Sequence, residues 1–82
     1  MEKYSVSWLE IAHDAYISLP VSRRRAVDDR LEQLASQPTA DSRQDPVTTW
    51  WTTTYGSGTG LLQYGVSRQH RRVVVLRLQD LG

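Results

Sequence analysis

Leu61-Leu-Gln-Tyr-Gly-Val66 leads into a basic run, Ser67-Arg-Gln-His-Arg-Arg72, and then into Val73-Val-Val-Leu-Arg-Leu78. The first and last of these runs are rich in β-branched and other apolar residues, which are typical of strands. The run between them is short and polar, which is typical of a turn that joins two paired strands. The stretch therefore predicts a β-hairpin over residues 61–78.

Two helices are expected upstream of this hairpin. Apolar residues recur at i, i+3 and i+4 spacing between residues 8 and 19 and again between residues 26 and 35, which is the period of a helix that buries one face. Pro20 separates the two stretches and Pro38 follows the second, and proline interrupts a helix. The short break predicts an antiparallel helical hairpin.

The remaining segments complete the order of elements. Residues 4–8 alternate apolar and polar side chains, and residues 47–55 are rich in Thr, Trp and Val, so both segments are expected to be strands. Residues 37–46 form a polar loop, and the glycine-rich residues 56–60 form a turn. The sequence thus predicts an α+β fold: a small βααβββ domain over residues 1–82, with an antiparallel sheet covered on one face by the helical hairpin.

Composition narrows the class of protein. The 82 residues carry a net charge of +1 and contain no cysteine, so neither a disulfide nor a thiolate metal site is expected. No apolar run approaches the ~18 residues that a membrane span needs, and Met1-Glu-Lys-Tyr4 does not begin a signal peptide. His13 and His70 are too isolated for a metal site. We expect a cytoplasmic protein without membrane association, metal, cofactor or small-molecule ligand.

Strand alternation assigns the side chains of the hairpin to two faces. The set that contains Gln63, Arg77 and Gln79 is the more polar, so we expect it to point away from the helices. Simple alternation adds Val73 and Val75 to that set. The opposite, helix-facing set consists of Leu62, Tyr64, Val66, Val74, Leu76 and Leu78.

An arginine among valines and leucines is costly unless it is exposed or paired. Arg77 therefore either contacts an anion on an open face of the sheet or pairs with Asp80 or with an acid of residues 37–46. The pair Trp50-Trp51 straddles the predicted strand. One indole packs beneath the helices or both do, and we name Trp51 as the candidate for stacking on a nucleic-acid base.

The last third of the chain is locally cationic. From residue 61 onward it holds four arginines and one acid, Asp80, which fits either an anionic partner or a solvated turn. His70 lies within the basic turn. The candidate nucleic-acid contacts are Arg68, His70, Gln63 and Trp51.

These segments together resemble the RelE/ParE toxin superfamily of bacterial toxin–antitoxin systems. The resemblance is one of pattern and order, and it covers nearly the whole chain. It rests on Tyr4-Ser-Val-Ser-Trp8, the Leu19-Pro20 break, Leu31-Glu-Gln-Leu34 before Pro38, Leu62-Gln-Tyr-Gly-Val66 and Arg72-Val-Val-Val-Leu-Arg77.

The resemblance implies a toxin that is neutralised by a cognate antitoxin. RelE-like members cut mRNA at the ribosome without a metal: the 2′-hydroxyl attacks its own phosphate while basic groups stabilise the developing charge. ParE-like members instead inhibit DNA gyrase. On the RelE-like interpretation, Arg77, Arg72 and Arg71 are the candidate catalytic residues, and the ribosome and mRNA are the expected partners.

The sequence departs from the nuclease pattern of the superfamily. Residues 47–55 carry threonines and tryptophans where family nucleases commonly have lysines or arginines, and Leu61-Leu62 stands where they have an arginine. The further arginine and the tyrosine or histidine of the usual tail have no counterpart up to Gly82. Three functions stay open: a RelE-like translation inhibitor, which we prefer, a ParE-like gyrase inhibitor, or a catalytically degenerate module that binds its antitoxin.

Overall fold

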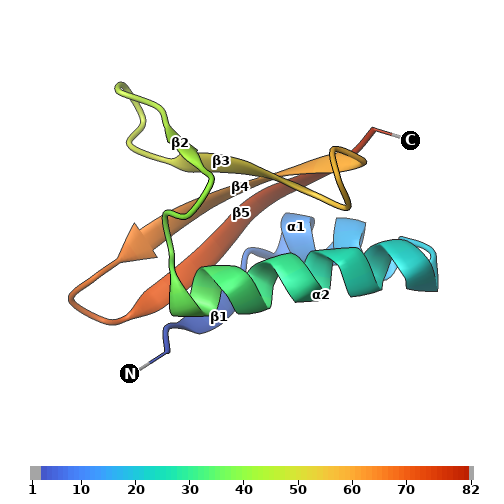
Figure 1. Cartoon of the computed structure of the whole chain (residues 1–82), viewed down its shortest axis with the longest axis horizontal. Coiled ribbons are helices and arrows are strands. Elements are labelled where there is room, and N and C mark those ends of the chain that lie inside the picture. The colour runs from blue at the N-terminus through green and yellow to red at the C-terminus, as the bar shows by residue number, and fades with distance from the viewer. Residues whose placement is uncertain (1–2, 82) are drawn as a thin grey trace.

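A computed structural model describes residues 3–81, so residues 1, 2 and 82 at the ends of the predicted domain lie outside it. One sheet of five strands carries two helices on one of its faces (Figure 1). No helix within the described part of the chain has the length and hydropathy to cross a membrane. In chain order the elements are β1 (Ser5–Trp8), α1 (Glu10–Ile17), α2 (Val21–Ser36), β2 (Arg43–Gln44), β3 (Trp51–Tyr55), β4 (Gly60–Ser67) and β5 (Arg72–Asp80).

The strand order in the sheet is β1-β5-β4-β3-β2. β1 pairs with β5 in parallel, and the other neighbours are antiparallel. The chain between β1 and β5, residues 9–71, contains both helices and three strands, which provides the long crossover that a parallel pair needs. The predicted βααβββ order is confirmed, with the two-residue β2 added inside the predicted loop and β3 shorter than predicted. The sheet is mixed, and not antiparallel throughout as predicted.

The hydrophobic core lies between the helices and the sheet. Val27, Leu31 and Leu34 of α2 are buried against the sheet residues that share one face of β3, β4 and β5. Burial of large apolar side chains supplies most of the stability of a domain this small, at roughly 1.5–3 kcal/mol each. The sheet contributes Tyr55, Leu62, Tyr64, Val73, Val75 and Leu78.

The sequence-based assignment of faces on β5 was wrong at its start. Tyr64 pairs with Val75 but Gln63 pairs with Arg77, so Leu76 is an extra residue in the ladder. Such a bulge reverses the alternation of side chains that follows it. Val73 and Val75 are therefore buried beneath the helices, whereas Arg77 is exposed on the opposite face, as expected.

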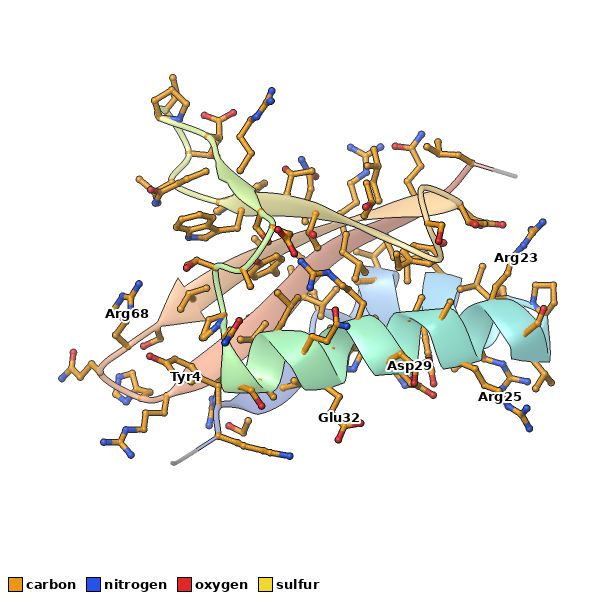
Figure 2. All side chains as sticks on the ribbon, in the orientation of Figure 1. Tyr4, Arg23, Arg25, Asp29, Glu32 and Arg68 are labelled. Atoms are coloured by element: carbon orange, nitrogen blue, oxygen red, sulfur yellow. The ribbon has the colours of Figure 1, made fainter. Side chains whose placement is uncertain are left out.

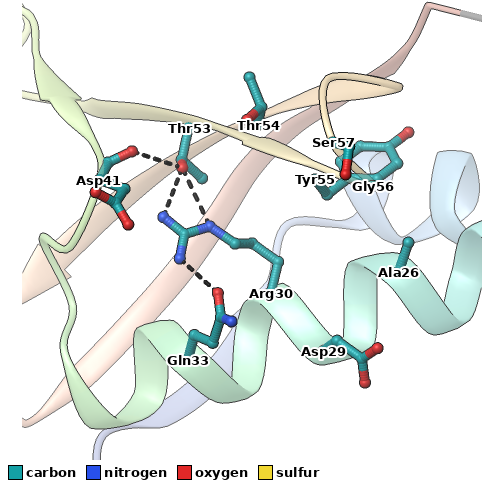
Figure 3. A pocket seen from close by; sticks show the side chains of 10 residues that line it. All are labelled: Ala26, Asp29, Arg30, Gln33, Asp41, Thr53, Thr54, Tyr55, Gly56 and Ser57. Atoms are coloured by element: carbon teal, nitrogen blue, oxygen red, sulfur yellow. Dashed lines mark hydrogen bonds between the residues drawn. The ribbon is translucent and has the colours of Figure 1, made fainter.

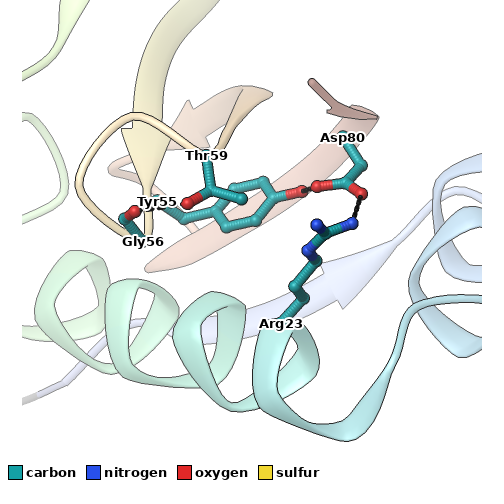
Figure 4. Close-up of polar contacts among 5 residues, drawn as sticks. All are labelled: Arg23, Tyr55, Gly56, Thr59 and Asp80. Carbon is teal, nitrogen blue, oxygen red and sulfur yellow. Dashed lines mark hydrogen bonds and ion pairs between the residues drawn. The ribbon is translucent and has the colours of Figure 1, made fainter. Parts of the chain in front are cut away.

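A polar contact ties the end of β5 to α2 (Figure 4). Arg23 Nη1 lies 2.6 Å from Asp80 Oδ2, and the Tyr55 hydroxyl donates to Asp80 Oδ1 at 3.1 Å. Asp80 thus pairs with Arg23 and not with Arg77. Burial, then the hydrogen bond and the negative charge of Asp80, raise the pKa of Tyr55 from 10.0 to about 12.

This raised pKa predicts a loss of stability in alkaline solution. The folded state holds the Tyr55 proton more tightly than the unfolded chain, so the stabilisation is complete below pH 10 and is lost as the pH rises towards 12. Chemical denaturation across this range should show the free energy of unfolding falling more steeply for the wild type than for Tyr55→Phe. Parallel pH profiles for the two proteins would contradict the assignment.

Candidate nucleic-acid interface

Four polar side chains form a row across the face of the sheet that the helices leave open. Arg43 of β2 pairs with Thr52 of β3, Thr52 with Gln63 of β4, and Gln63 with Arg77 of β5. Directly opposed residues point to the same side of a sheet. Because neighbouring strands lie about 4.8 Å apart, the backbones of the two arginines are about 14 Å apart. We call these four residues the polar row.

The surface beside the polar row is hollowed. A depression of about 80 Å³ is lined by Thr52, Leu61, Gln63, Arg77 and Gln79. A broader one, of about 510 Å³, adjoins it through Thr52 and Leu61 and reaches Arg43. The two arginines therefore border adjoining depressions on one face. The remaining residues that line the broader one are Asp41, Ser42, Thr53 and Thr54.

The guanidinium groups of the polar row are available for an anion. Within residues 3–81, neither the Arg43 nor the Arg77 side chain takes part in an ion pair or hydrogen bond. Arg77 faces no acid in the smaller depression, and Asp80 is held by Arg23. A guanidinium carries five donors in a planar fork that matches phosphate oxygens. Of the two alternatives for Arg77, this geometry favours contact with an anion on the open face over pairing with an acid of the chain.

A buried arginine holds the loop that delivers Arg43 to the sheet (Figure 3). Arg30 of α2 is 9% exposed, and its guanidinium donates to Thr53 Oγ1 at 2.7 Å, to Gln33 Oε1 at 2.9 Å and to the carbonyl of Ala40. Thr53 Oγ1 in turn donates to the carbonyl of Asp41 at 3.1 Å. These contacts fix the backbone two residues before Arg43.

Tyr64 secures the same loop from the middle of the sheet. Its hydroxyl donates to the carbonyl of Pro38 at 2.6 Å and lies 2.7 Å from Ser42 Oγ. Burial raises the pKa of Tyr64 above its ordinary value. Two buried side chains of different elements, Arg30 and Tyr64, thus position β2 and the arginine that it carries.

The basic turn between β4 and β5 lies away from the polar row. Arg68, His70, Arg71 and Arg72 are all exposed there (Figure 2 labels Arg68), and Arg72 precedes Arg77 by five residues, or about 16 Å of strand. On the open face of β4 between them stands Gly65, whose Cβ, if present, would meet only Leu76 Cδ1, at 3.9 Å. The structure brings Arg77 and Gln63 together but keeps the turn residues apart from them.

The two adjacent tryptophans have opposite environments. Trp51 is partly buried, packs against the core and pairs with the buried Tyr64, so its indole lies on the helix-facing side. Trp50 precedes β3 and is 44% exposed. Trp51, the predicted stacking residue, is therefore not on the open face, and Trp50 is the more exposed of the two indoles.

Sequence reasoning missed Arg43. A strand of two residues leaves no periodicity to detect, and only its register with Thr52 reveals the position of Arg43. Of the described residues that line the two depressions, none is a histidine or lysine, and Asp41 alone is acidic. The interface can therefore bind and stabilise negative charge, and it presents no group that titrates near neutral pH for proton transfer.

The opposite side of the molecule carries most of the acids. Asp29 and Glu32 of α2 extend away from the sheet, as does Arg25 (Figure 2). All three residues are exposed, so this face of α2 is solvated. Because Asp41 is the one acid among the described residues that line the two depressions, the open face is the more favourable side for an anionic partner.

The fold, but not the sequence, has clear relatives. No family model matches the chain, and no curated protein does. Three solved structures superpose closely. The RelBE2 toxin–antitoxin complex of Mycobacterium tuberculosis has a TM-score of 0.82 at 22% identity and covers 95% of this chain and 98% of its own. The archaeal RelE–RelB complex of Pyrococcus horikoshii OT3 has a TM-score of 0.77 at 17% identity, with coverages of 98% and 97%, and the isolated RelE toxin of E. coli has a TM-score of 0.83 at 16% identity, with coverages of 96% and 85%. The chain has the RelE fold.

Proposed function

We propose that this protein is the toxin of a bacterial type II toxin–antitoxin system and that it inhibits translation in the cytoplasm by acting on mRNA at the ribosome. The polar row carries the proposal, because it places Arg43 and Arg77, neither of them in an ion pair within residues 3–81, on the open face of a RelE fold. The similar structures are RelE proteins, which favours translation as the target over DNA gyrase.

The chemistry expected of the row is stabilisation of charge on phosphate. When a 2′-hydroxyl of RNA gives its proton to water and forms a bond to the adjacent phosphorus, the bond from phosphorus to the 5′-oxygen breaks and that oxygen takes a proton from water. Negative charge builds up on the phosphate oxygens during this step. The Arg77 guanidinium can donate two parallel hydrogen bonds to those oxygens, and Gln63 lies directly beside it. Of the predicted catalytic residues, Arg77 keeps this role, whereas Arg71 and Arg72 are better placed to guide RNA at the basic turn.

A cognate antitoxin is the second proposed partner, as two of the similar structures are RelB–RelE complexes. β1 pairs with β5 only as far as Val75, so within the described chain the next part of that edge has no strand beside it. A hollow of about 370 Å³ lined by Ile11, Ala12, Ala15 and residues 76–78 adjoins this edge. Ile11 is 74% exposed. An unpaired edge beside apolar side chains suits an extended peptide.

Arg77→Ala tests the proposal. Inducible expression of the wild type in a bacterium should arrest growth and stop pulse-labelled protein synthesis before DNA synthesis. The substitution removes the fork that binds phosphate, and we expect it to reduce toxicity at least tenfold in the inducer concentration needed, as the loss of a charged hydrogen bond costs roughly 1.5–3 kcal/mol.

Arg25→Ala is the matched control, because Arg25 is exposed on the helical side, and this variant should remain toxic. Full toxicity of Arg77→Ala would refute the role of Arg77. An earlier fall in DNA synthesis would instead identify a gyrase inhibitor, and a harmless wild type would leave a module that binds only its antitoxin.

A further inference from the structure

The segment from Arg43 to Trp50 projects from the sheet as a separate arm (Figure 1). Its tip is stabilised by Asp45, whose Oδ1 accepts hydrogen bonds from the backbone N–H groups of Val47 at 2.7 Å and Thr48 at 3.0 Å. The backbone of Asp45 also accepts from Thr49 N and donates to Trp50 O, each at 2.8 Å. Hydrogen bonds at this density make the arm a preformed element of the surface.

Trp50 stands where this arm joins the open face. Gln44 pairs with Trp51, and the bond from Asp45 N to Trp50 O extends the ladder by one step. Alternation then directs Trp50 to the side of Thr52, about 7 Å along the chain, and away from the side of Trp51. Trp50 is 44% exposed, so a ligand can reach its indole.

The combination on this face matches one class of ligand. An exposed indole offers a flat surface on which any base can stack, and arginines bind the phosphates that flank it. Between the arginines lie a hydroxyl and an amide, Thr52 and Gln63. Such groups hydrogen-bond the 2′-hydroxyl that distinguishes RNA from DNA. A double helix would not present its bases to the indole, so the ligand is single-stranded.

We propose that Trp50 is a stacking platform for one base of the RNA on the open face, next to phosphates held by Arg43 and Arg77 and ribose hydroxyls contacted by Thr52 and Gln63. The inference rests on the proposed function and specifies how its substrate is held. Stacking tolerates every base, so recognition depends weakly on sequence. Two phosphate contacts imply that the logarithm of the binding constant falls with the logarithm of salt concentration with a slope of about −1.4.

The test is fluorescence anisotropy with a short fluorescein-labelled oligouridine and the purified protein. Trp50→Ala should bind about tenfold or more weakly than the wild type, and Trp50→Phe, which keeps an aromatic face, should retain most of the affinity. Val47→Ala is the matched control, because Val47 is on the same arm and 88% exposed. It should bind like the wild type. Far-UV circular dichroism checks that each variant is folded.

The outcomes separate this inference from the function on which it rests. Trp50→Ala with wild-type affinity overturns the stacking, and if Arg77→Ala is weakened in the same assay, the RNA-directed function stands. Equal binding of the matching oligodeoxyuridine overturns the assignment to RNA. A wild type that binds no oligomer overturns the inference entirely, and the pulse-labelling experiment then decides independently whether the protein is a translation inhibitor.

Discussion

Replacing Gly60 with alanine is expected to lower the free energy of unfolding by about 3 kcal/mol. Gly60 opens β4 directly over the ring of Tyr55. A Cβ at this position would lie 2.3 Å from both Cζ and Oη of that ring. Tyr55 is 1% exposed and its hydroxyl is bonded to Asp80, so the ring has no free space into which to move. For a domain of this size the loss corresponds to a melting temperature roughly 15 °C lower.

Gly65→Ala is the matched control in the same strand. The nearest heavy atom to its new Cβ is Leu76 Cδ1 at 3.9 Å, which is ordinary contact. Its stability should stay within about 0.5 kcal/mol of the wild type. Urea denaturation followed by tryptophan fluorescence measures both variants. If both variants lost the same free energy of unfolding, any side chain at a glycine of β4 would be destabilising, and the specific clash with Tyr55 would be refuted.

The second large effect is expected at Arg30. Arg30→Met keeps much of the aliphatic stem but removes every donor from a site that is 9% exposed. Thr53 Oγ1 and the carbonyl of Ala40 would each lose a buried partner. Unsatisfied buried groups cost about 1–3 kcal/mol each, so we expect a loss of about 3 kcal/mol.

Hydrogen exchange provides a local test of the same change. In Arg30→Met the amides of residues 37–44 should exchange much faster than those of β4, because the loop loses its attachment to α2. Arg25→Met on the exposed side of the same helix should leave both stability and exchange unchanged. If the two methionine variants unfolded at the same urea concentration, Arg30 would not be the anchor of the loop.

The regular elements were predictable because they repeat. α2 follows the i, i+3, i+4 pattern for four turns, and the β4–β5 hairpin has apolar runs on both sides of a polar turn. The bulge at Leu76 was not predictable, since one unpaired residue leaves the local composition unchanged and appears only in the register of two strands. Val73 and Val75 were misassigned for that reason.

The candidate site was predictable in part. Gln63 and Arg77 stand out as polar residues in apolar strands, and their pairing follows from the hairpin. Arg43 joins them through contacts between residues distant in sequence, which no local pattern encodes. The misassignment of Trp51 has a similar cause: β3 begins at Trp51, and its first residue faces the core. A shift of one residue in the start of a strand exchanges its faces.

The parallel pairing of β1 with β5 has a consequence for synthesis. Residues 5–8 pair with residues 72–75, so the first strand of the sheet to leave the ribosome can pair only after the last strand has been synthesised. Local helical contacts can form early, but the sheet closes only through contacts between opposite ends of the chain, which is slow and costly in loop entropy. A nascent chain without residues 72–80 lacks both the neighbour of β1 and Arg77. The proposed toxic activity is therefore expected to arise only after residues 72–80 have left the ribosome, when a partner made beforehand can already be present.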